Sequence, residues 1–278
     1  MKEKIKLIYI LGAGHSGSTL LDHLLSSHDQ IESGGEIYKY LPYVSDTLGV
    51  RPFDNRYCGC GAHITDCEYW KSIKSIIAEE HDTYEIDLNV KDAESFAVNN
   101  KSVIHAMLQT SGKSVFCDSS KGIVRLKHLV DSQQFDIWIV HLIRDGRAVG
   151  YSHQKKGHGF LKTVYRWQKI LKRHQKGLQS FGDEERIIRL RYEDLVENPA
   201  KHLAKILSRV GLNYSPELLN FRASEHHILS GNRMRWSDEQ EIRKDVSYIK
   251  KINLLNWGMA DILSGVSLKK QGYSLFKK

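Results

Sequence analysis

The sequence predicts a three-layer α/β domain in which helices cover both faces of a central parallel sheet. Three observations carry this prediction. Short apolar runs of strand length recur along the chain, leucine-rich stretches with helical spacing separate them, and no linker-like tract interrupts the 278 residues. Strands that alternate with helices form parallel sheets through right-handed crossovers. The length suits one well-buried core, so we expect a single domain over residues 1–278.

Four apolar runs have the length and composition of buried strands. They are Leu7–Leu11, Val115–Cys117, Ile137–Ile143 and Ile187–Leu190. The first run is too short to span a bilayer, which takes about 20 apolar residues. It also leads into Gly-His-Ser-Gly rather than into a small-residue cleavage site. We therefore interpret it as a core strand and expect neither a membrane segment nor a signal peptide.

Helices are predicted between these strands. Asn198 and Pro199 are typical of a helix start, and Gly211 is typical of the residue after a helix end. Apolar residues recur at helical spacing after the first strand and within this later segment, at Leu20, Leu21, Leu24, Leu25, Leu203, Ile206, Leu207 and Val210.

The composition limits the function classes. Hydrophobic residues at 41%, charged residues at 27% and only 4 prolines exclude a disordered, collagen-like or disulfide-dense chain. The 41 Lys and Arg against 33 Asp and Glu give a net charge of +8, which favours an anionic ligand. The four cysteines are too few to staple a chain of this size, so we expect a reducing, cytoplasmic location.

A glycine loop follows the first strand and precedes a helix, over Gly12-Ala-Gly-His-Ser-Gly17. Backbone N–H groups of such a loop, with the positive end of the helix, form a cradle for phosphate. The spacing matches a Walker A motif, but Ser18 stands where that motif needs lysine, so a triphosphate would lack its main cation. The alternative is a turn that serves only close packing.

A second anion-binding segment follows the third strand. Arg144 lies at the carboxyl end of that strand, where ligands bind in parallel sheets, and its planar fork suits a terminal phosphate. Ser152 follows in the next helix and can add a hydroxyl donor. The alternative is a local surface ion pair between Arg144 and Asp145.

Together these segments resemble a known family. Gly14-His-Ser-Gly-Ser-Thr-Leu-Leu followed by Leu-Ile-Arg144-Asp-Gly-Arg-Ala-Val-Gly-Tyr-Ser152 is similar to the two nucleotide-binding segments of sulfotransferases that use 3′-phosphoadenosine 5′-phosphosulfate (PAPS), most of all the bacterial and tyrosylprotein-type branch. Arg191-Tyr-Glu-Asp-Leu and Gly231-Asn-Arg-Met-Arg resemble later family segments. The resemblance spans Leu7 to Trp236 and implies a P-loop-containing domain.

The resemblance implies a role for each matching position. The first loop would bind the 5′-phosphosulfate, and Arg144 with Ser152 would bind the 3′-phosphate, leaving adenosine 3′,5′-bisphosphate as product. Tyr192 either contacts the nucleotide or packs beside it. The expected nucleotide-binding residues are Gly14, His15, Ser16, Gly17, Ser18, Thr19, Arg144, Ser152, Lys156, Tyr192, Arg233 and Arg235.

Three residues are candidates for catalysis. His15 stands where the family usually has Arg or Lys, and a neutral imidazole would stabilise the leaving phosphate less or in a pH-dependent way. Lys121, in a segment similar to one in bacterial sulfotransferases, could supply the missing charge or be a solvated lysine. Glu36 inherits the general-base role by resemblance; an exposed carboxylate is the alternative. Histidine could serve as base instead, with His63, His153, His158, His226 and His227 as possibilities.

A metal is not expected. Sulfuryl groups carry fewer negative charges than phosphoryl groups, so protein cations can suffice. The segment Cys58-x-Cys60-x-x-His63-x-x-x-Cys67 has metal-like ligand types, but its spacing is not a common zinc pattern. We interpret it as a structural loop near the acceptor pocket; zinc binding and thiol pairing are alternatives.

The predicted function is sulfuryl transfer from PAPS to a hydroxyl or amino group of a small metabolite or carbohydrate. Residues 40–110 and 222–278 are expected to cover the sheet edge and shape the acceptor pocket. One alternative is a P-loop kinase or NTPase with Asp118 as its metal-binding carboxylate. Another is an inactive nucleotide- or RNA-binding module, although the chain has no RNA-recognition signature, so no nucleic-acid or membrane partner is expected. The sequence leaves the oligomeric state open.

Overall fold

A five-stranded sheet forms the centre of the molecule. The computed structural model describes residues 4–45, 56–231, 236 and 242–277. The strand order is β2-β3-β1-β4-β5, and each neighbouring pair is parallel. The strands are β1 (Ile5–Gly12), β2 (Ile31–Ser33), β3 (Val115–Lys121), β4 (Phe135–Ile143) and β5 (Ile187–Arg191). The predicted fold class and the four predicted strands are confirmed.

The edge strand β2 was not predicted. It is only three residues long, and two of them, Glu32 and Ser33, are polar although they are buried. A short strand of this composition has no apolar run for a sequence pattern to detect.

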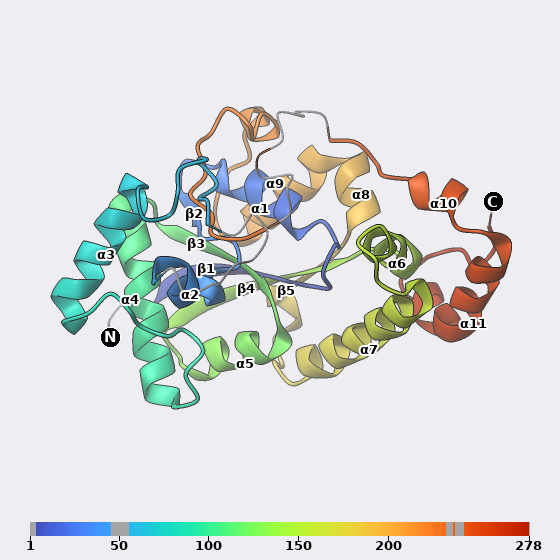
Figure 1. The fold of residues 1–278 in the computed structure, drawn as a ribbon, viewed down its shortest axis with the longest axis horizontal. Coiled ribbons are helices and arrows are strands. Elements are labelled where there is room, and N and C mark those ends of the chain that lie inside the picture. Colours follow the sequence, from blue (N-terminus) through green and yellow to red (C-terminus); the bar gives the residue numbers. More distant parts are fainter. Residues whose placement is uncertain (1–3, 46–55, 232–235, 237–241, 278) are drawn as a thin grey trace.

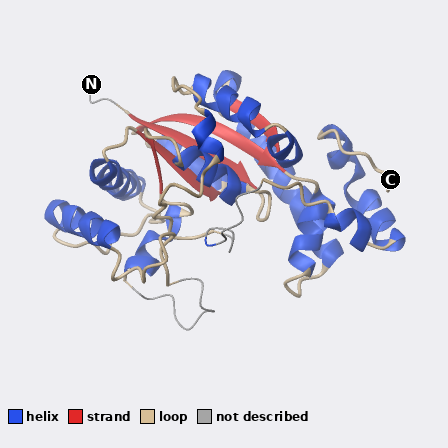
Figure 2. Ribbon diagram, turned by 90° about the horizontal axis from the view of Figure 1, so that it is seen from above, coloured by secondary structure: helices blue, strands red, loops and turns tan. Residues whose placement is uncertain are grey.

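Helices cover both faces of the sheet (Figures 1 and 2). Figure 1 shows α1, α8 and α9 on one face and α4, α5 and α7 on the other. The described helices are α1 (Ser18–Ser26), α2 (Tyr40–Val44), α3 (Glu68–His81), α4 (Ala93–Ser111), α5 (Ile123–Asp131), α6 (Gly146–Gln154), α7 (Phe160–Gln179), α8 (Tyr192–Glu197), α9 (Pro199–Arg209), α10 (Ser247–Lys251) and α11 (Leu254–Lys270), with short 3-10 turns η1 (Ile37–Lys39), η3 (Glu184–Arg186) and η4 (Pro216–Leu219).

Strand β1 divides the core into two layers. Its side chains alternate between the faces, so Ile8 and Ile10 pack with the leucines of α1 and α9, whereas Leu7 and Tyr9 pack with α3, α4 and α5. The predicted helix after Asn198 is α9, and the chain leaves it through a positive φ of 76° at Gly211.

The topology brings three strand ends together. The chain places β3 on one side of β1 and β4 on the other. In register, Leu11 of β1 lies beside Lys121 of β3, and Gly12 lies beside Leu142 of β4. The loops after these three strands therefore meet at one edge, which is where doubly wound sheets bind ligands.

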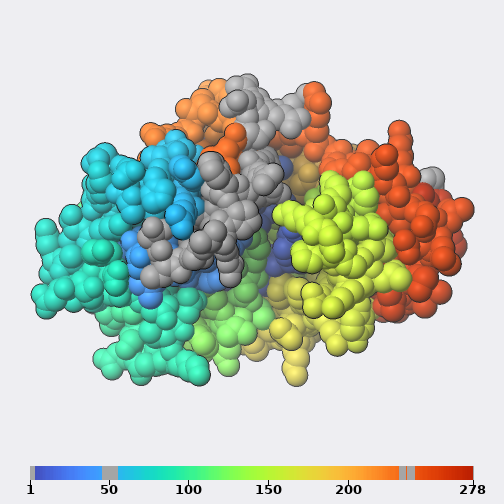
Figure 3. Space-filling model, in the orientation of Figure 1, coloured from blue at the N-terminus to red at the C-terminus, as the bar shows by residue number. Residues whose placement is uncertain are grey.

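The two ends of the molecule are built from different parts of the chain. In the space-filling view, residues 56–110 occupy one end, and α6, α7 and the C-terminal helices gather at the other (Figure 3). Within the described parts of the chain, none of the helices combines the length and the apolar character needed to cross a membrane.

Candidate functional site

A cavity of about 570 Å³ lies at the carboxyl edge of the sheet. It is lined by the loops after β1, β3 and β4 and by the turn after β2. Later residues also line it, namely Arg222, Ser230, Gly231, Ile242, Arg243 and Asp245. The structure brings most of the predicted site residues to its wall, namely Gly14, His15, Gly17, Ser18, Thr19, Glu36, Lys121, Arg144, Ser152, Lys156 and Tyr192. Ser16 is fully buried, and its Oγ donates to the carbonyl of Ala13 at 2.6 Å. Arg233 and Arg235 lie outside the described residues.

The glycine loop is wound tightly against its neighbours. Gly17 has a φ of 92° and caps α1, and a Cβ there would come within 2.3 Å of the Tyr192 ring. A Cβ on Gly12 would approach the carbonyl oxygen of Leu142 to 2.9 Å. Only glycine fits at these two positions, so the loop places the N-terminus of α1 directly at the cavity.

Arg144 joins the second segment to the glycine loop. Its Nη1 donates to the carbonyl oxygen of His15 at 3.2 Å, and its Nη2 forms a 3.1 Å ion pair with Asp245. The guanidinium carbon lies 4.4 Å from the centre of the Tyr192 ring. The buried Nε has no hydrogen-bond partner within the described residues. Arg144 also lines the cavity, where its positive charge favours an anionic ligand.

The alternative that Arg144 pairs locally with Asp145 is wrong. Asp145 is 1% exposed and binds Arg147 instead, with Oδ2 2.7 Å from Nη2. Arg144 is itself 8% exposed, so it is not a surface residue. The guanidinium therefore lines the cavity and does not form the local ion pair with Asp145.

His15 is an uncharged member of the site at neutral pH. Its Nδ1 lies 3.1 Å from the Oγ of Ser152, and its ring packs edge-on against His153. Burial lowers the pKa of His15 to about 4, and the nearby charge of Lys156 and of Arg144 adds to the effect. Without an anion in the cavity, the imidazole is neutral above about pH 5.

Glu36 lies between two lysines at the other side of the cavity. Its carboxylate forms an ion pair with Lys121, and the Nζ of Lys39 lies 2.5 Å from Oε2. Burial alone would raise the pKa of this carboxyl, but the two ammonium groups outweigh it and lower the pKa to about 2. The side chains of Glu36 and Lys121 are 15% and 18% exposed, so neither is the solvated surface residue considered as the alternative.

A buried carboxylate supports the turn that carries Glu36. Asp22, on α1, accepts hydrogen bonds from Ser33 at 2.5 Å and Ser119 at 2.8 Å. The Oγ of Ser33 in turn accepts from the backbone N–H of Gly35 at 3.0 Å. Burial raises the pKa of Asp22 to about 6. Sequence reasoning missed this group because Asp22 and its two partners come from three separate elements, α1, β2 and β3.

Several cavity residues were not predicted. Lys39 lies three residues after Glu36, and this i,i+3 spacing was the signal that could have identified it. Arg222, Ser230 and Asp245 also line the cavity, but no motif in the chain marks them. Among the histidines considered as bases, the described cavity wall includes His153.

Asp118 does not offer a metal-binding carboxylate. It is fully buried, its Oδ2 pairs with the Nε of Arg125 at 3.0 Å, and its Oδ1 accepts from the N–H of Ser120 at 2.8 Å. Within the described cavity lining, Asp118 is absent. The role that the kinase alternative gives this residue therefore has no support.

Comparisons with known proteins agree with this geometry. The sequence matches the profile of the sulfotransferase family over residues 8–216. A comparison with curated proteins found no match. The fold is similar to that of the sulfotransferase domain from the curacin biosynthetic pathway, with a TM-score of 0.62 and 19% identity over 98% of this chain and 99% of that one.

Two further solved structures share the fold. The sulfotransferase domain of the Synechococcus PCC 7002 olefin synthase has a TM-score of 0.59 and 20% identity, covering 99% of this chain and 98% of that one. Sulfotransferase STF1 from Mycobacterium tuberculosis H37Rv has a TM-score of 0.51 and 14% identity, covering 85% and 78%. The profile match covers most of the chain, and the chain belongs to the sulfotransferase family.

Proposed function

We propose that this protein transfers the sulfuryl group of PAPS to a hydroxyl or amino group of a small acceptor, a metabolite or carbohydrate, and releases adenosine 3′,5′-bisphosphate. One observation carries the proposal. A single cavity joins a glycine loop that lacks the Walker lysine to the side chain of Arg144. This arrangement suits a nucleotide with phosphate groups at two ends.

The nucleotide would be held from both sides of the glycine loop. The loop and the N-terminus of α1 offer backbone donors and a positive dipole for the 5′-phosphosulfate. Arg144, Ser152 and Lys156 line the same cavity and would bind the 3′-phosphate through charge-assisted hydrogen bonds. Tyr192 would hold the glycine loop and Arg144 in place, because its ring packs against Gly17 and lies under the guanidinium of Arg144.

Transfer then needs one proton acceptor and a stabilised leaving group. The acceptor oxygen or nitrogen would form a bond to sulfur as its proton passes to the carboxylate of Glu36. The bond between sulfur and the bridging phosphate oxygen breaks, and Lys121 and His15 would stabilise the charge that develops on that oxygen. Protein cations fill this role, so the proposal requires no metal in the transfer step.

The low pKa of Glu36 applies to the free protein, before PAPS binds. With two lysines on its oxygens, the carboxylate is a weak base. A phosphosulfate in the cavity would compete for the same ammonium groups, because it offers more negative charge than one carboxylate. We propose that Lys121 turns to the bridging oxygen, which frees Glu36 and raises its pKa toward that of an ordinary carboxyl.

The acceptor side of the site is proposed to include Arg222, Ser230 and Asp245. These three residues line the cavity, whereas the described part of residues 40–110 contributes no lining residue. Differences in acceptor choice are therefore expected to depend on side chains after β5 rather than on α3 or α4.

A binding comparison separates this function from phosphoryl transfer. Titration calorimetry should show tighter binding of adenosine 3′,5′-bisphosphate than of ATP with Mg²⁺. Incubation with PAPS and candidate acceptors should then yield a product heavier by one SO₃ unit, still formed when no Mg²⁺ is added. Preference for ATP with Mg²⁺ would overturn the proposal.

A further inference from the structure

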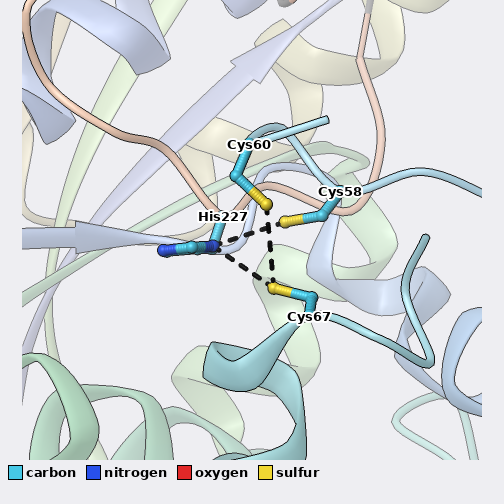
Figure 4. Close-up of side chains that lie close together, drawn as sticks. All are labelled: Cys58, Cys60, Cys67 and His227. Atoms are coloured by element: carbon cyan, nitrogen blue, oxygen red, sulfur yellow. Dashed lines mark hydrogen bonds between the residues drawn. The ribbon is translucent and has the colours of Figure 1, made fainter. Parts of the chain in front are cut away.

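Four metal-ligating side chains converge outside the nucleotide cavity. Cys58 and Cys60 lie in the loop before α3, Cys67 caps α3, and His227 comes from the segment after η4 (Figure 4). Their ligand atoms all lie within 4.8 Å of one another. We propose that these four residues bind one zinc ion in a structural Cys₃His site.

Three of the six distances between ligand atoms match a zinc tetrahedron. Cys58 Sγ and Cys67 Sγ each lie 3.5 Å from His227 Nδ1, and Cys60 Sγ lies 3.8 Å from Cys67 Sγ. Bonds of about 2.3 Å to sulfur and about 2.0 Å to nitrogen, at tetrahedral angles, separate S and N by about 3.5 Å and two S atoms by about 3.8 Å. A disulfide instead needs its sulfurs at about 2.05 Å. The cluster therefore has the spacing of a metal site rather than of a disulfide.

The position of Cys67 favours a thiolate. This residue caps α3, and the positive end of the helix dipole stabilises a negative charge there. Thiolate is the form of cysteine that binds metal.

The frame of the site is rigid without the ion. The N–H of Gly59 donates to the carbonyl of Ile228 at 3.0 Å, and a Cβ on Gly59 would come within 2.3 Å of the carbonyl oxygen of His226. The ring of Tyr69 stacks on His227 with centres 4.3 Å apart and planes 7° apart. These contacts aim Nδ1 of His227 at the sulfurs, so binding would require little rearrangement.

Sequence spacing selects the wrong histidine. The local pattern places His63 among the cysteines, but its Nδ1 lies 2.7 Å from the Oγ1 of Thr65 and it is outside the cluster. His227 is the fourth residue, more than 150 positions away from Cys67 in the chain. The uncommon spacing therefore arises because the site is closed by a distant segment.

Metal binding here would hold one wall of the nucleotide cavity. Two residues after His227, the N–H of Leu229 donates to the carbonyl of Gly34 at 3.1 Å. Ser230 follows and accepts from Lys39 Nζ at 2.8 Å. Lys39 in turn pairs with Glu36. A zinc ion at His227 would fix this strip of chain, and with four protein ligands it would have no open position for catalysis.

Binding at this site is a simple exchange of protons for metal. One Zn²⁺ replaces three thiol protons, which are released, while His227 binds as neutral imidazole, and no oxidation occurs. Metal analysis of the full chain, purified without chelator and under reducing conditions, should find about one zinc per chain. Replacing zinc by Co²⁺ should give the intense visible bands of a tetrahedral site and the ultraviolet bands of thiolate–cobalt bonds.

Matched variants identify the ligands. Cys67→Ala and His227→Ala should lose the metal, whereas His63→Ala and Cys117→Ala, which change a histidine and a cysteine outside the cluster, should retain it. His227→Cys should still bind Co²⁺, with a stronger thiolate band. Binding by this variant would show that His227→Ala loses the metal because a ligand is missing and not because the protein misfolds. Three results would each overturn the proposal. The first is a protein that neither contains zinc nor takes it up on addition, and the second is a metal-free protein whose intact mass is lower by two hydrogens. The third is equal metal content in His227→Ala and His63→Ala.

Discussion

Lys121 and Glu36, 85 positions apart in the chain, form an ion pair at the carboxyl edge of the sheet. Lys121 holds its position with a φ of 70°, a conformation that costs free energy for a residue with a side chain. The pair links the end of β3 to the turn after β2, and Lys39 adds a second cation. The site therefore holds one carboxylate in contact with two ammonium groups.

Replacing Glu36 by Gln should separate catalysis from nucleotide binding. We expect turnover to fall about 10²- to 10⁴-fold, because the acceptor proton loses its base. Affinity for adenosine 3′,5′-bisphosphate should be unchanged or tighter, because Lys39 and Lys121 lose a competing anion. Single-turnover rates and calorimetry measure the two effects. Glu217→Gln, at an exposed site, is the control, and wild-type turnover in the Glu36 variant would exclude this residue as base.

Replacing Arg144 should act first on nucleotide binding. Arg144→Ala removes a positive charge from the cavity wall, so the dissociation constant for adenosine 3′,5′-bisphosphate should rise about 10- to 100-fold. Arg144→Lys should give an intermediate value, since it keeps the charge but loses the fork and the stacking on Tyr192.

The control for this variant is Arg189→Ala. Arg189 is exposed and pairs with Glu184, away from the cavity, and its loss should leave the affinity unchanged. An Arg144→Ala protein that binds the nucleotide as tightly as the Arg189→Ala protein would show that the guanidinium does not hold a phosphate.

The neutral state of His15 predicts a pH-dependent affinity. The pKa of His15 is about 4 in the free protein because of burial and nearby cations. A bound polyanion raises that pKa, so binding takes up a proton and the affinity should increase as the pH falls from 7 toward 5. His15→Lys carries its charge throughout, so its affinity should be higher at pH 7 and change less with pH.

The comparison of the two proteins removes the ligand's own titration. Phosphate groups of adenosine 3′,5′-bisphosphate gain protons over the same pH range in both experiments, so only the difference between the two slopes reports on residue 15. Calorimetric titrations at several pH values measure this difference. Identical slopes would mean that His15 does not become protonated in the complex.

Local motifs made part of the site predictable. The glycine loop and Arg144 could be identified because each follows its own apolar strand, and parallel strands bring their carboxyl ends to one edge. The partners of these residues could not be identified from the sequence. Asp245, which binds Arg144, and His227, which meets Cys67, lie more than 100 positions from them, and no spacing rule links such distant segments. Strand β2 was missed because burial of Glu32 and Ser33 depends on tertiary contacts.

Asp22 makes a prediction about stability rather than activity. Burial raises the pKa of its carboxyl from 3.8 to about 6, so the folded protein favours the protonated form more than the unfolded chain does. The contribution of Asp22 to the free energy of unfolding is therefore largest below about pH 4. It is lost as the pH rises through about 6. The shift corresponds to about 2 to 3 kcal/mol.

Replacing Asp22 by Asn tests this contribution directly. The amide has nearly the same shape and can keep contacts with Ser33 and Ser119, but it does not titrate. Urea unfolding of both proteins between pH 4.5 and 7.5 should show the wild type losing free energy of unfolding relative to the Asn variant as the pH rises. Other groups titrate equally in both proteins and cancel in the difference. Parallel curves would mean that the Asp22 carboxyl is solvated or compensated in the folded state, so that its pKa is not raised by burial.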